Sequence, residues 1–157
     1  MKNKLMRNII ISLIMIVAIL LLTNCKVYAA GTENVPESAY TYVELEDGTV
    51  QITDFDYSQI SYNTSLKIPS TLGGKTVTKI GARAFYFVLQ INELVIPDTV
   101  KEIGSYAFYY CSNLKSITLG NSVETIGSYA FSNETRVTSL DIPSSVKDIA
   151  YTAFLES

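Results

Sequence analysis

The chain has 157 residues, of which 12 are basic and 15 acidic, and it contains no histidine. Without histidine, catalytic triads with an imidazole base, the common zinc sites and ordinary proton shuttles are excluded. We therefore expect no enzymatic activity, no catalytic residue, no bound metal and no cofactor.

The N-terminal segment has the features of a secretory signal peptide. An apolar run over 9–22 leads into the sequence NCKVYAAG, and three basic residues precede it: Lys2, Lys4 and Arg7. This order of charged, apolar and small-residue regions predicts a signal peptide over residues 1–29, with cleavage near Ala29. As a helix the apolar run covers about 21 Å, short of the roughly 30 Å hydrocarbon core, so a permanent membrane span is the weaker interpretation.

Lipid attachment is an alternative fate of this segment. The sequence LTNC resembles a bacterial lipoprotein box and would place the lipid on Cys25, although Asn24 stands where a small residue is expected. Either route exports the chain. We expect a secreted, extracellular protein, either released or associated with the cell surface.

Cleavage after residue 29 changes the charge of the chain. The removed segment holds four of the 12 basic residues and no acidic one, which leaves 8 basic against 15 acidic residues and a net charge of −7. Nucleic acids and anionic membrane surfaces require a basic footprint, so we expect neither as a partner, and membrane contact only through the signal peptide during export. Cys111 is then the single cysteine, so packing and not an internal disulfide must hold the fold together.

Residues 30–65 are predicted to form a linker and a β-hairpin that caps the rest of the fold. Asp47-Gly48 is a signal for a hairpin turn. Asp54 and Asp56 stand two apart, so on a strand they share a face and would bind a cation or act as an acid pair. Solvated acids on a lead-in hairpin explain the two residues as well.

Residues 66–157 contain a repeat with a period of 23 residues. The pair Ile-Gly recurs at this interval, and so does a phenylalanine five positions after the isoleucine. Because no single copy can bury these residues alone, the copies must stack into one continuous core. We predict about four coils, the last incomplete, with eight core residues: Ile80, Phe85, Ile103, Phe108, Ile126, Phe131, Ile149 and Phe154.

Each copy predicts a short strand followed by a helical turn. ELVIP, SITLG and SLDIP are short apolar or alternating runs that stop at proline or glycine, as short strands do. Gly104 and Gly127 would allow a backbone conformation that a side chain penalises, and Ser105 or Ser128 would then begin a helical turn. The predicted fold is an α/β repeat solenoid, a short right-handed array of 23-residue coils behind an N-terminal β-hairpin lead-in.

The segment LVIPDTVKEIGSYAFYYCSNL resembles the leucine-rich repeats of the BspA type, the Treponema pallidum type found in bacterial surface proteins. The resemblance covers residues 66–157, with a lead-in from about Tyr40, and it implies adhesion. Ala150 departs from the pattern by replacing glycine, and the sequence stops at Ser157 inside a repeat without a visible cap. A truncated fragment of a larger surface protein is therefore one interpretation of the chain.

Cys111 is a candidate nucleophile. Without histidine it lacks the usual activating base, although a lysine or a helix end would serve in its place. The equivalent residues in the neighbouring copies are Val88 and Glu134, and the family pattern that Cys111 resembles often has cysteine there as a small buried filler. We predict the filler role, with a reactive thiol as the alternative.

Two surfaces are candidates for binding. On the outer wall, Tyr106 and Tyr129 hold the same repeat position, and Tyr109 and Tyr110 lie beside them. Exposed rings there would stack on sugars or fill pockets of a protein partner; in the alternative they pack on the next coil and leave only the hydroxyl in water. The outward face of the strands is small and mixed in character, with four candidates: Glu93, Val95, Thr118 and Asp141.

We therefore expect a secreted or cell-surface leucine-rich-repeat protein that mediates protein–protein interaction or adhesion. The expected partner is a protein on a host or neighbouring cell. The alternative partner is a glycan, bound by a carbohydrate or cell-wall module that uses the exposed tyrosines.

Overall fold

The computed structural model describes residues 35–157. The predicted signal peptide over 1–29 and Cys25 lie outside the described residues. Among residues 35–157, no helix is long and apolar enough to cross a membrane.

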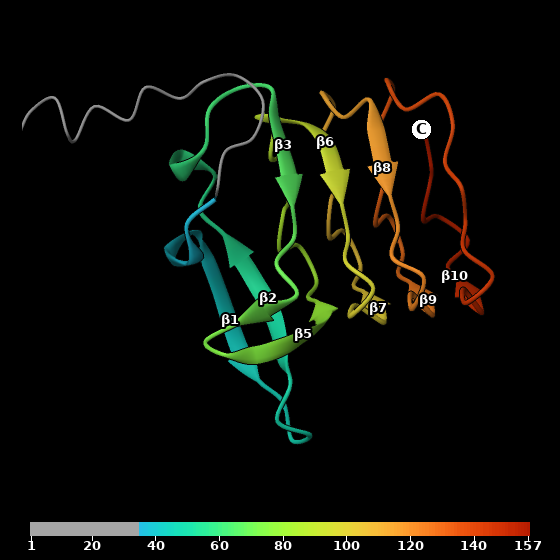
Figure 1. The fold of residues 1–157 in the computed structure, drawn as a ribbon. Helices are drawn as coiled ribbons and strands as arrows, with labels where there is room; N and C mark the ends of the chain where they lie inside the picture. Colours follow the sequence, from blue (N-terminus) through green and yellow to red (C-terminus); the bar gives the residue numbers. More distant parts are fainter. Residues whose placement is uncertain (1–34) are drawn as a thin grey trace, which may run out of the picture.

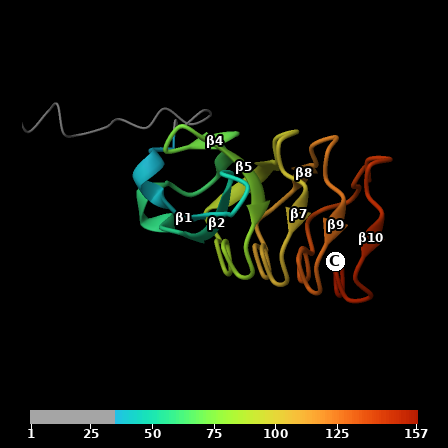
Figure 2. The same ribbon diagram turned by 90° about the horizontal axis from the view of Figure 1, so that it is seen from below.

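Short strands arranged as a stack of coils make up the described part of the chain (Figures 1 and 2). The helices within it are two 3-10 turns in the N-terminal part: η1 (Glu37–Ala39) and η2 (Tyr57–Gln59). The strands are β1 (Tyr40–Glu44), β2 (Val50–Phe55), β3 (Thr64–Lys67), β4 (Thr71–Leu72), β5 (Lys75–Ile80), β6 (Ile91–Val95), β7 (Glu102–Ile103), β8 (Ser116–Thr118), β9 (Thr125–Ile126) and β10 (Asp148–Ile149).

One long sheet runs through the molecule in the order β1-β2-β5-β7-β9-β10, with β4 paired to β5. From β5 onward the strands are parallel, and each ladder partner lies one repeat further along the chain: Lys79 pairs with Glu102, Glu102 with Thr125, and Asp148 with Thr125. This step is 23 residues each time, because each coil returns the chain to the same place beside the coil before it.

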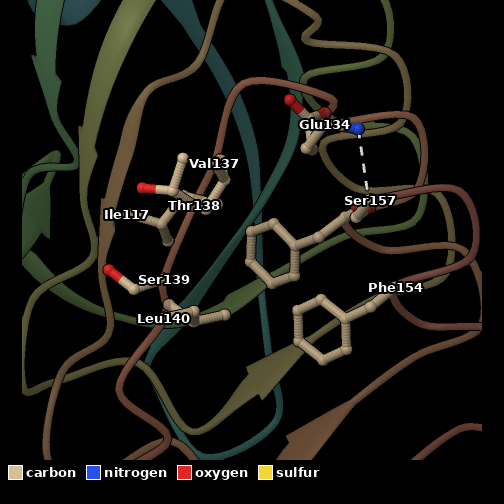
Figure 3. Close-up of a pocket in the computed structure, with 9 residues that line it drawn as sticks. Ile117, Glu134, Val137, Thr138, Ser139, Leu140, Phe154 and Ser157 are labelled. Atoms are coloured by element: carbon tan, nitrogen blue, oxygen red, sulfur yellow. Dashed lines mark hydrogen bonds between the residues drawn. The ribbon is translucent and has the colours of Figure 1, made fainter.

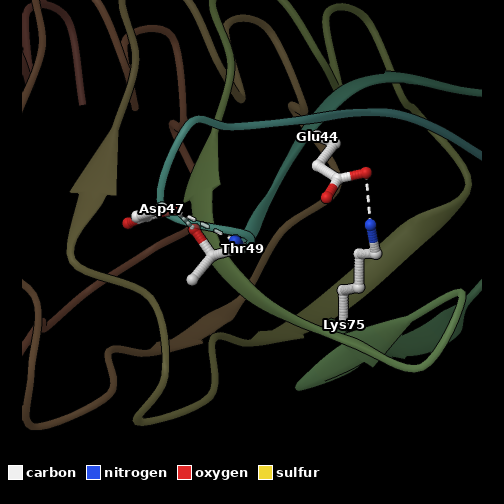
Figure 4. Close-up of polar contacts among 4 residues, drawn as sticks. All are labelled: Glu44, Asp47, Thr49 and Lys75. Atoms are coloured by element: carbon white, nitrogen blue, oxygen red, sulfur yellow. Dashed lines mark hydrogen bonds and ion pairs between the residues drawn. The ribbon is translucent and has the colours of Figure 1, made fainter.

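The N-terminal hairpin joins this sheet. β1 and β2 pair antiparallel around Asp47-Gly48, where Gly48 has a φ of 79° and the Asp47 carboxylate accepts hydrogen bonds from the Thr49 backbone N–H (3.0 Å) and hydroxyl (2.6 Å). β2 then pairs parallel with β5. Figure 4 shows this turn and the ion pair between Glu44 of β1 and Lys75 of β5. The hairpin therefore covers the first coil and also supplies a strand to the parallel ladder.

A second sheet lies on another side of the coils, in the order β3-β6-β8 (Figure 1). Leu66, Leu94 and Ile117 are paired in it and buried. The strand predicted in SLDIP is wrong, because residues 139–142 form no strand and Ile142 is 42% exposed. Residues 139–142 form no ladder with β8, although β10 of the same coil does pair with β9.

The predicted helical turns are also wrong. The segments after each Ile-Gly pair form successive turns, in which Tyr106 and Tyr110 have φ values of 59° and 60°, outside the right-handed helical region. Their backbone N–H groups donate to carbonyls of the next coil, Tyr106 to Ser128 (2.9 Å) and Tyr110 to Ser132 (3.0 Å). Since these N–H groups bond between coils, they are not available for a helix.

The core is a column of phenylalanine rings, one per coil. Phe85 stacks on Phe108 with ring centroids 4.9 Å apart, Phe108 on Phe131 at 5.3 Å, and Phe131 on Phe154 at 5.6 Å. The isoleucines Ile80, Ile103 and Ile126 are buried beside this column. Ile149 was predicted to be a core residue and is not, because it lies 46% exposed on the last described coil, where no further coil covers it.

The repeated glycines are required for space and not for an unusual φ. Neither Gly104 nor Gly127 has a positive φ. A Cβ atom added to Gly104 would lie 2.7 Å from the Ala82 nitrogen and 2.8 Å from the Gly81 carbonyl carbon. Glycine therefore lets neighbouring coils approach closely, which corrects the expectation of a special backbone conformation at these positions.

Candidate binding surface

The outer wall carries stacked aromatic side chains that continue from coil to coil. Tyr86 stacks on Tyr109 (5.3 Å between centroids, 10° between planes), and Phe87 stacks on Tyr110 (4.5 Å, 18°). Tyr106 stacks on Tyr129 (4.8 Å, 15°), with the Arg83 guanidinium 5.4 Å from the centre of the Tyr106 ring. We call these six aromatic residues the aromatic patch: Tyr86, Phe87, Tyr106, Tyr109, Tyr110 and Tyr129.

The stacks also touch one another sideways. Tyr86 lies 4.9 Å from Phe87, and Tyr109 lies 5.5 Å from Tyr106 in an edge-to-face arrangement and 6.5 Å from Tyr129. The aromatic patch is therefore one continuous surface across three coils. Edge and face contacts of this kind fix the rings relative to each other, so little side-chain entropy is left to lose on binding.

Each ring in the patch has one face covered by a stacked ring of a neighbouring coil. Tyr86, Phe87 and Tyr110 are 41%, 43% and 39% exposed, while Tyr106, Tyr109 and Tyr129 are half-buried. None of the five tyrosine hydroxyls in the patch has a hydrogen-bond partner within residues 35–157, and none is buried from water. The patch therefore offers apolar ring edges together with hydroxyl groups that can donate or accept.

The backbone under the patch is unusual. Phe87, Tyr106, Tyr110 and Tyr129 have φ values between 57° and 62°, in the left-handed region that glycine and asparagine prefer. A large residue there costs roughly 1–2 kcal/mol. One coil beyond Tyr110, Asn133 holds the same conformation with φ 67°. The chain therefore retains aromatic rings at positions where asparagine satisfies the backbone better.

The sequence placed four of the six patch residues correctly near one another. Tyr106, Tyr109, Tyr110 and Tyr129 all belong to the patch. Three of them are half-buried, Tyr106 stacked on the next coil and Tyr109 and Tyr129 on the preceding one, while Tyr110 is exposed. Tyr86 and Phe87 were missed. They stand one repeat before Tyr109 and Tyr110, so the repeat spacing contained the signal that identifies them.

The outward face of the strands does not contribute to the patch. Glu93 and Val95 lie on β6, and Thr118 lies on β8. The Glu93 carboxylate accepts a hydrogen bond from the Ser65 hydroxyl (2.6 Å) on the neighbouring strand. Asp141 was expected to continue this column but lies in the segment without a strand, so the structure brings only the first three together.

Asp54 and Asp56 do not share a strand face, so the acid pair considered as an alternative does not form. Asp54 is in β2, but Asp56 follows the strand and caps η2, accepting from the Ser58 backbone N–H (3.0 Å) and hydroxyl (2.6 Å). Hydrogen bonds from Ser58 and Gln59 lower the pKa of Asp56. Within the described residues no group of three or more acidic or cysteine side chains is placed to hold a metal ion.

Cys111 is fully buried, as the filler role requires. Its Sγ donates a hydrogen bond to the Phe85 carbonyl (3.2 Å), and burial, together with the nearby Glu134, raises the pKa of the Cys111 thiol well above its usual value. A thiol held protonated and away from solvent is a poor nucleophile.

A buried carboxyl group near the last coil was not predicted from the sequence. Glu134, at the repeat position of Cys111, is 1% exposed, and its Oε1 accepts from the Cys111 backbone N–H (2.8 Å) while its Oε2 has no partner. It lines a hollow of about 190 Å³ with Phe131, Val137 and Phe154 (Figure 3). Burial raises the pKa of Glu134 from 4.5 to about 8.

Stacked coils with parallel ladders and an aliphatic and aromatic core define a leucine-rich-repeat solenoid. The chain belongs to the BspA type leucine rich repeat family, whose profile matches residues 36–157 in six copies. The family match begins at residue 36, whereas the sequence analysis placed the start of the array at residue 66. The parallel pairing of β2 with β5 agrees with the earlier start. Proteins of this family are generally non-enzymatic binding scaffolds, and leucine-rich repeats generally mediate protein–protein interactions.

Solved structures of bacterial proteins share this fold. A leucine-rich repeat protein from Bacteroides capillosus matches with a TM-score of 0.65 and 30% identity over 72% of this chain and 84% of that chain. A leucine rich cell surface protein from Faecalibacterium prausnitzii matches with a TM-score of 0.60 and 33% identity over 78% of this chain and 32% of that chain. The T. pallidum leucine rich repeat protein has the same fold, with a TM-score of 0.56 and 22% identity over 74% of this chain and 64% of that chain.

The chain therefore spans about a third of the length of the Faecalibacterium protein. No curated protein matches the chain at a significant level.

Proposed function

We propose that the chain is exported and acts outside the cell or at the cell surface as an adhesion module, which binds a protein on another cell through the aromatic patch. The observation that carries the proposal is the patch itself, in which Phe87 and Tyr110 are exposed. The predicted signal peptide and the similarity to a cell surface protein of Faecalibacterium support an external location.

The composition of the patch fits a protein-binding hot spot. Tyrosine is enriched where protein interfaces carry most of their binding energy, because it combines apolar area with a hydroxyl and loses little conformational freedom. The strained backbone at Phe87 and Tyr110 supports a role for these rings, since asparagine at the same repeat position, as in Asn133, fits the backbone without an aromatic side chain.

A protein partner fits the ring geometry better than a glycan. A sugar binds an aromatic side chain by laying its C–H groups on the ring face. In the patch one face each of Tyr109 and Tyr110 is covered by Tyr86 and Phe87 of the preceding coil, which leaves fewer ring faces for a sugar. The ring edges and hydroxyls match the carbonyl groups and apolar side chains of a polypeptide surface.

The test compares a patch variant with a matched surface variant. Phe87→Asn with Tyr110→Asn removes two exposed rings and keeps a residue that tolerates a positive φ, as Asn133 does. Tyr62→Asn removes a tyrosine that is 69% exposed on the loop before β3, outside the patch. Each protein is immobilised and assayed for capture of cell-surface proteins, with photo-crosslinking from position 109 to identify what binds, and in parallel on a glycan array.

We expect saturable binding of one or a few proteins by the parent chain and by Tyr62→Asn, and loss of that binding in the Phe87→Asn/Tyr110→Asn variant. Thermal melts of all three proteins check that the fold is intact. Binding that survives loss of both rings, or binding to glycans and not to proteins, would contradict the proposal.

A further inference from the structure

A single cation stands against the rings of the aromatic patch. Arg83 is exposed, and its guanidinium carbon lies 5.4 Å from the centre of the Tyr106 ring. Arg83, Tyr106 and Tyr129 occupy the same position in three successive repeats. Since Tyr106 stacks on Tyr129, the guanidinium takes the place of a ring at the start of this stack. The first coil of the patch therefore carries a positive charge beside its rings.

Arg83 has no acidic partner within residues 35–157. The ion pairs in this part of the chain join Lys75 with Glu44, Lys79 with Glu102, and Lys147 with Glu124. Arg83 belongs to none of them, and its side chain donates no hydrogen bond to a described residue. A guanidinium keeps its charge near neutral pH and has five N–H donors in a planar fork. These donors are therefore available to a binding partner.

The three turns that carry the patch have no exposed acidic side chain. They cover residues 82–90, 105–113 and 128–136, and Glu134 is the only acidic residue among them. Glu134 is 1% exposed, so its carboxyl group does not reach the surface. Every other acidic residue of the chain stands outside these turns, although the chain has 15 acidic and 12 basic residues. The wall under the patch is therefore neutral or positive in a chain that is acidic as a whole.

Ring contacts connect Arg83 to the rest of the patch. Tyr106, which lies under the guanidinium, touches Tyr109 edge to face at 5.5 Å, and Tyr109 stacks on Tyr86 at 5.3 Å. A protonated tyrosine hydroxyl donates as well as accepts hydrogen bonds. A carboxylate bound at Arg83 would therefore have hydroxyl donors and apolar ring edges beside it.

We infer that the protein partner presents an acidic segment to the patch, in which an aspartate or glutamate carboxylate pairs with the Arg83 guanidinium while neighbouring apolar side chains lie against the rings. The inference rests on the proposed function, because it names the chemistry of the partner at the same surface. Two N–H groups of a guanidinium match the two oxygens of a carboxylate. Burial of the pair beside the rings lowers the local dielectric constant and strengthens the attraction.

The probe is a library of random peptides displayed on phage and selected on immobilised residues 30–157, which contain every residue of the described core. We expect the selected peptides to share an acidic residue close to aromatic or aliphatic ones. One selected peptide is then synthesised in two forms, as selected and with each acidic residue replaced by its amide. Both forms are titrated against the parent chain and its variants.

The test variant is Arg83→Gln, which removes the charge and keeps a polar side chain. The matched control is Arg136→Gln, because Arg136 is the other exposed arginine in these turns and shares its repeat position with Asn113, outside the patch. Thermal melts check that both variants are folded. The acidic peptide should bind the parent and Arg136→Gln equally and bind Arg83→Gln about tenfold more weakly, because charge-assisted hydrogen bonds are lost. High salt should also weaken binding to the parent.

The amide form of the peptide separates pairing from a merely structural role of Arg83. If Arg83 binds the carboxylate, the amide form should bind the parent about as weakly as the acidic form binds Arg83→Gln, and the amide change should cost nothing further in that variant. If Arg83 only supports the Tyr106 ring, Arg83→Gln weakens both forms equally, and the inference is wrong.

Three other results would overturn the inference: selected peptides without acidic residues, a library that yields no binding peptide, or binding to heparin and to no acidic peptide. Failure of the proposed function gives a different result. Binding that requires Phe87 and Tyr110 but not Arg83 keeps the patch as the binding surface and rejects the acidic segment. Binding that survives in Phe87→Asn/Tyr110→Asn rejects both.

Discussion

The protein should lose stability as the pH rises from about 4.5 to about 8, because of Glu134, the one buried carboxyl group among residues 35–157. This residue is 1% exposed, its Oε2 has no hydrogen-bond partner, and no cation is among the groups that shift its pKa. Desolvation disfavours the charged form, which raises the pKa of Glu134 from 4.5 to about 8.

The direction of the change in stability depends on whether the folded or the unfolded chain binds the Glu134 proton more tightly. Below about pH 4.5 the carboxyl group is protonated in both states and the stability is fully present. As the pH rises, the unfolded chain releases its proton first, while the folded chain keeps it until about pH 8. Each pH unit between these values lowers the free energy of unfolding by about 1.4 kcal/mol, so the total loss is on the order of 3–5 kcal/mol.

Urea unfolding of residues 30–157 at several pH values measures this loss. The chain contains no histidine, so no imidazole titrates in this range. Glu134→Gln is the matched variant, because glutamine can still accept from the Cys111 N–H and cannot ionise. The variant should have a flat profile, match the parent near pH 5, and exceed its stability by a few kcal/mol near pH 9.

The reasoning is refuted by a parent chain whose stability does not change across this range. It is refuted equally by a Glu134→Gln variant that loses stability with the same slope, since another group would then be responsible.

Three further changes test the core and the coil spacing. Phe108→Ala should cost on the order of 3–5 kcal/mol, because the ring is fully buried between two others, while Lys115→Ala on an exposed side chain should cost little; equal and small effects in denaturant unfolding would disprove the packing assignment. Gly104→Ala should lower the melting temperature by several degrees, because the new Cβ would lie 2.7 Å from a backbone nitrogen of the preceding coil, and an unchanged melt would show that the coils have room to separate. Cys111 should react with a thiol reagent only as fast as the protein opens, and rapid labelling of the folded protein would restore the reactive-thiol interpretation.

The sequence predicted the repeat and the residues inside it because both follow from periodicity. Phe85, Phe108 and Phe131 recur at one interval and are all buried in the structure, and the Asp47-Gly48 signal marks a real hairpin turn. The error at Ile149 arises because a repeat pattern assigns the last copy the same neighbours as the others, while the structure leaves the outer side of the last described coil uncovered. The missing strand at 139–142 has no such explanation, since β10 of the same coil pairs with β9.

The helical turns were wrong for a different reason. Ser105 and the residues after it have the composition of a helix start, but their N–H groups bond to the next coil, a tertiary contact that a single copy does not reveal. Glu134 was likewise invisible as a buried acid, because a glutamate in a polar stretch predicts an exposed side chain. The sequence analysis identified four of the six residues of the aromatic patch. Tyr86 and Phe87 stand 23 residues before Tyr109 and Tyr110, so an alignment of the copies would have added them.

The uniform ladder step also bears on how such a protein could change in length. The segment IGSYAF is identical at 103–108 and at 126–131, so the insertion of one whole copy would keep the pattern of the array. Every residue of an added copy would meet the same neighbours above and below, and the core would need no other change. Each added copy would also extend the aromatic patch by one coil. The number of contacts offered to a partner, and with it the avidity, would then depend on the number of copies.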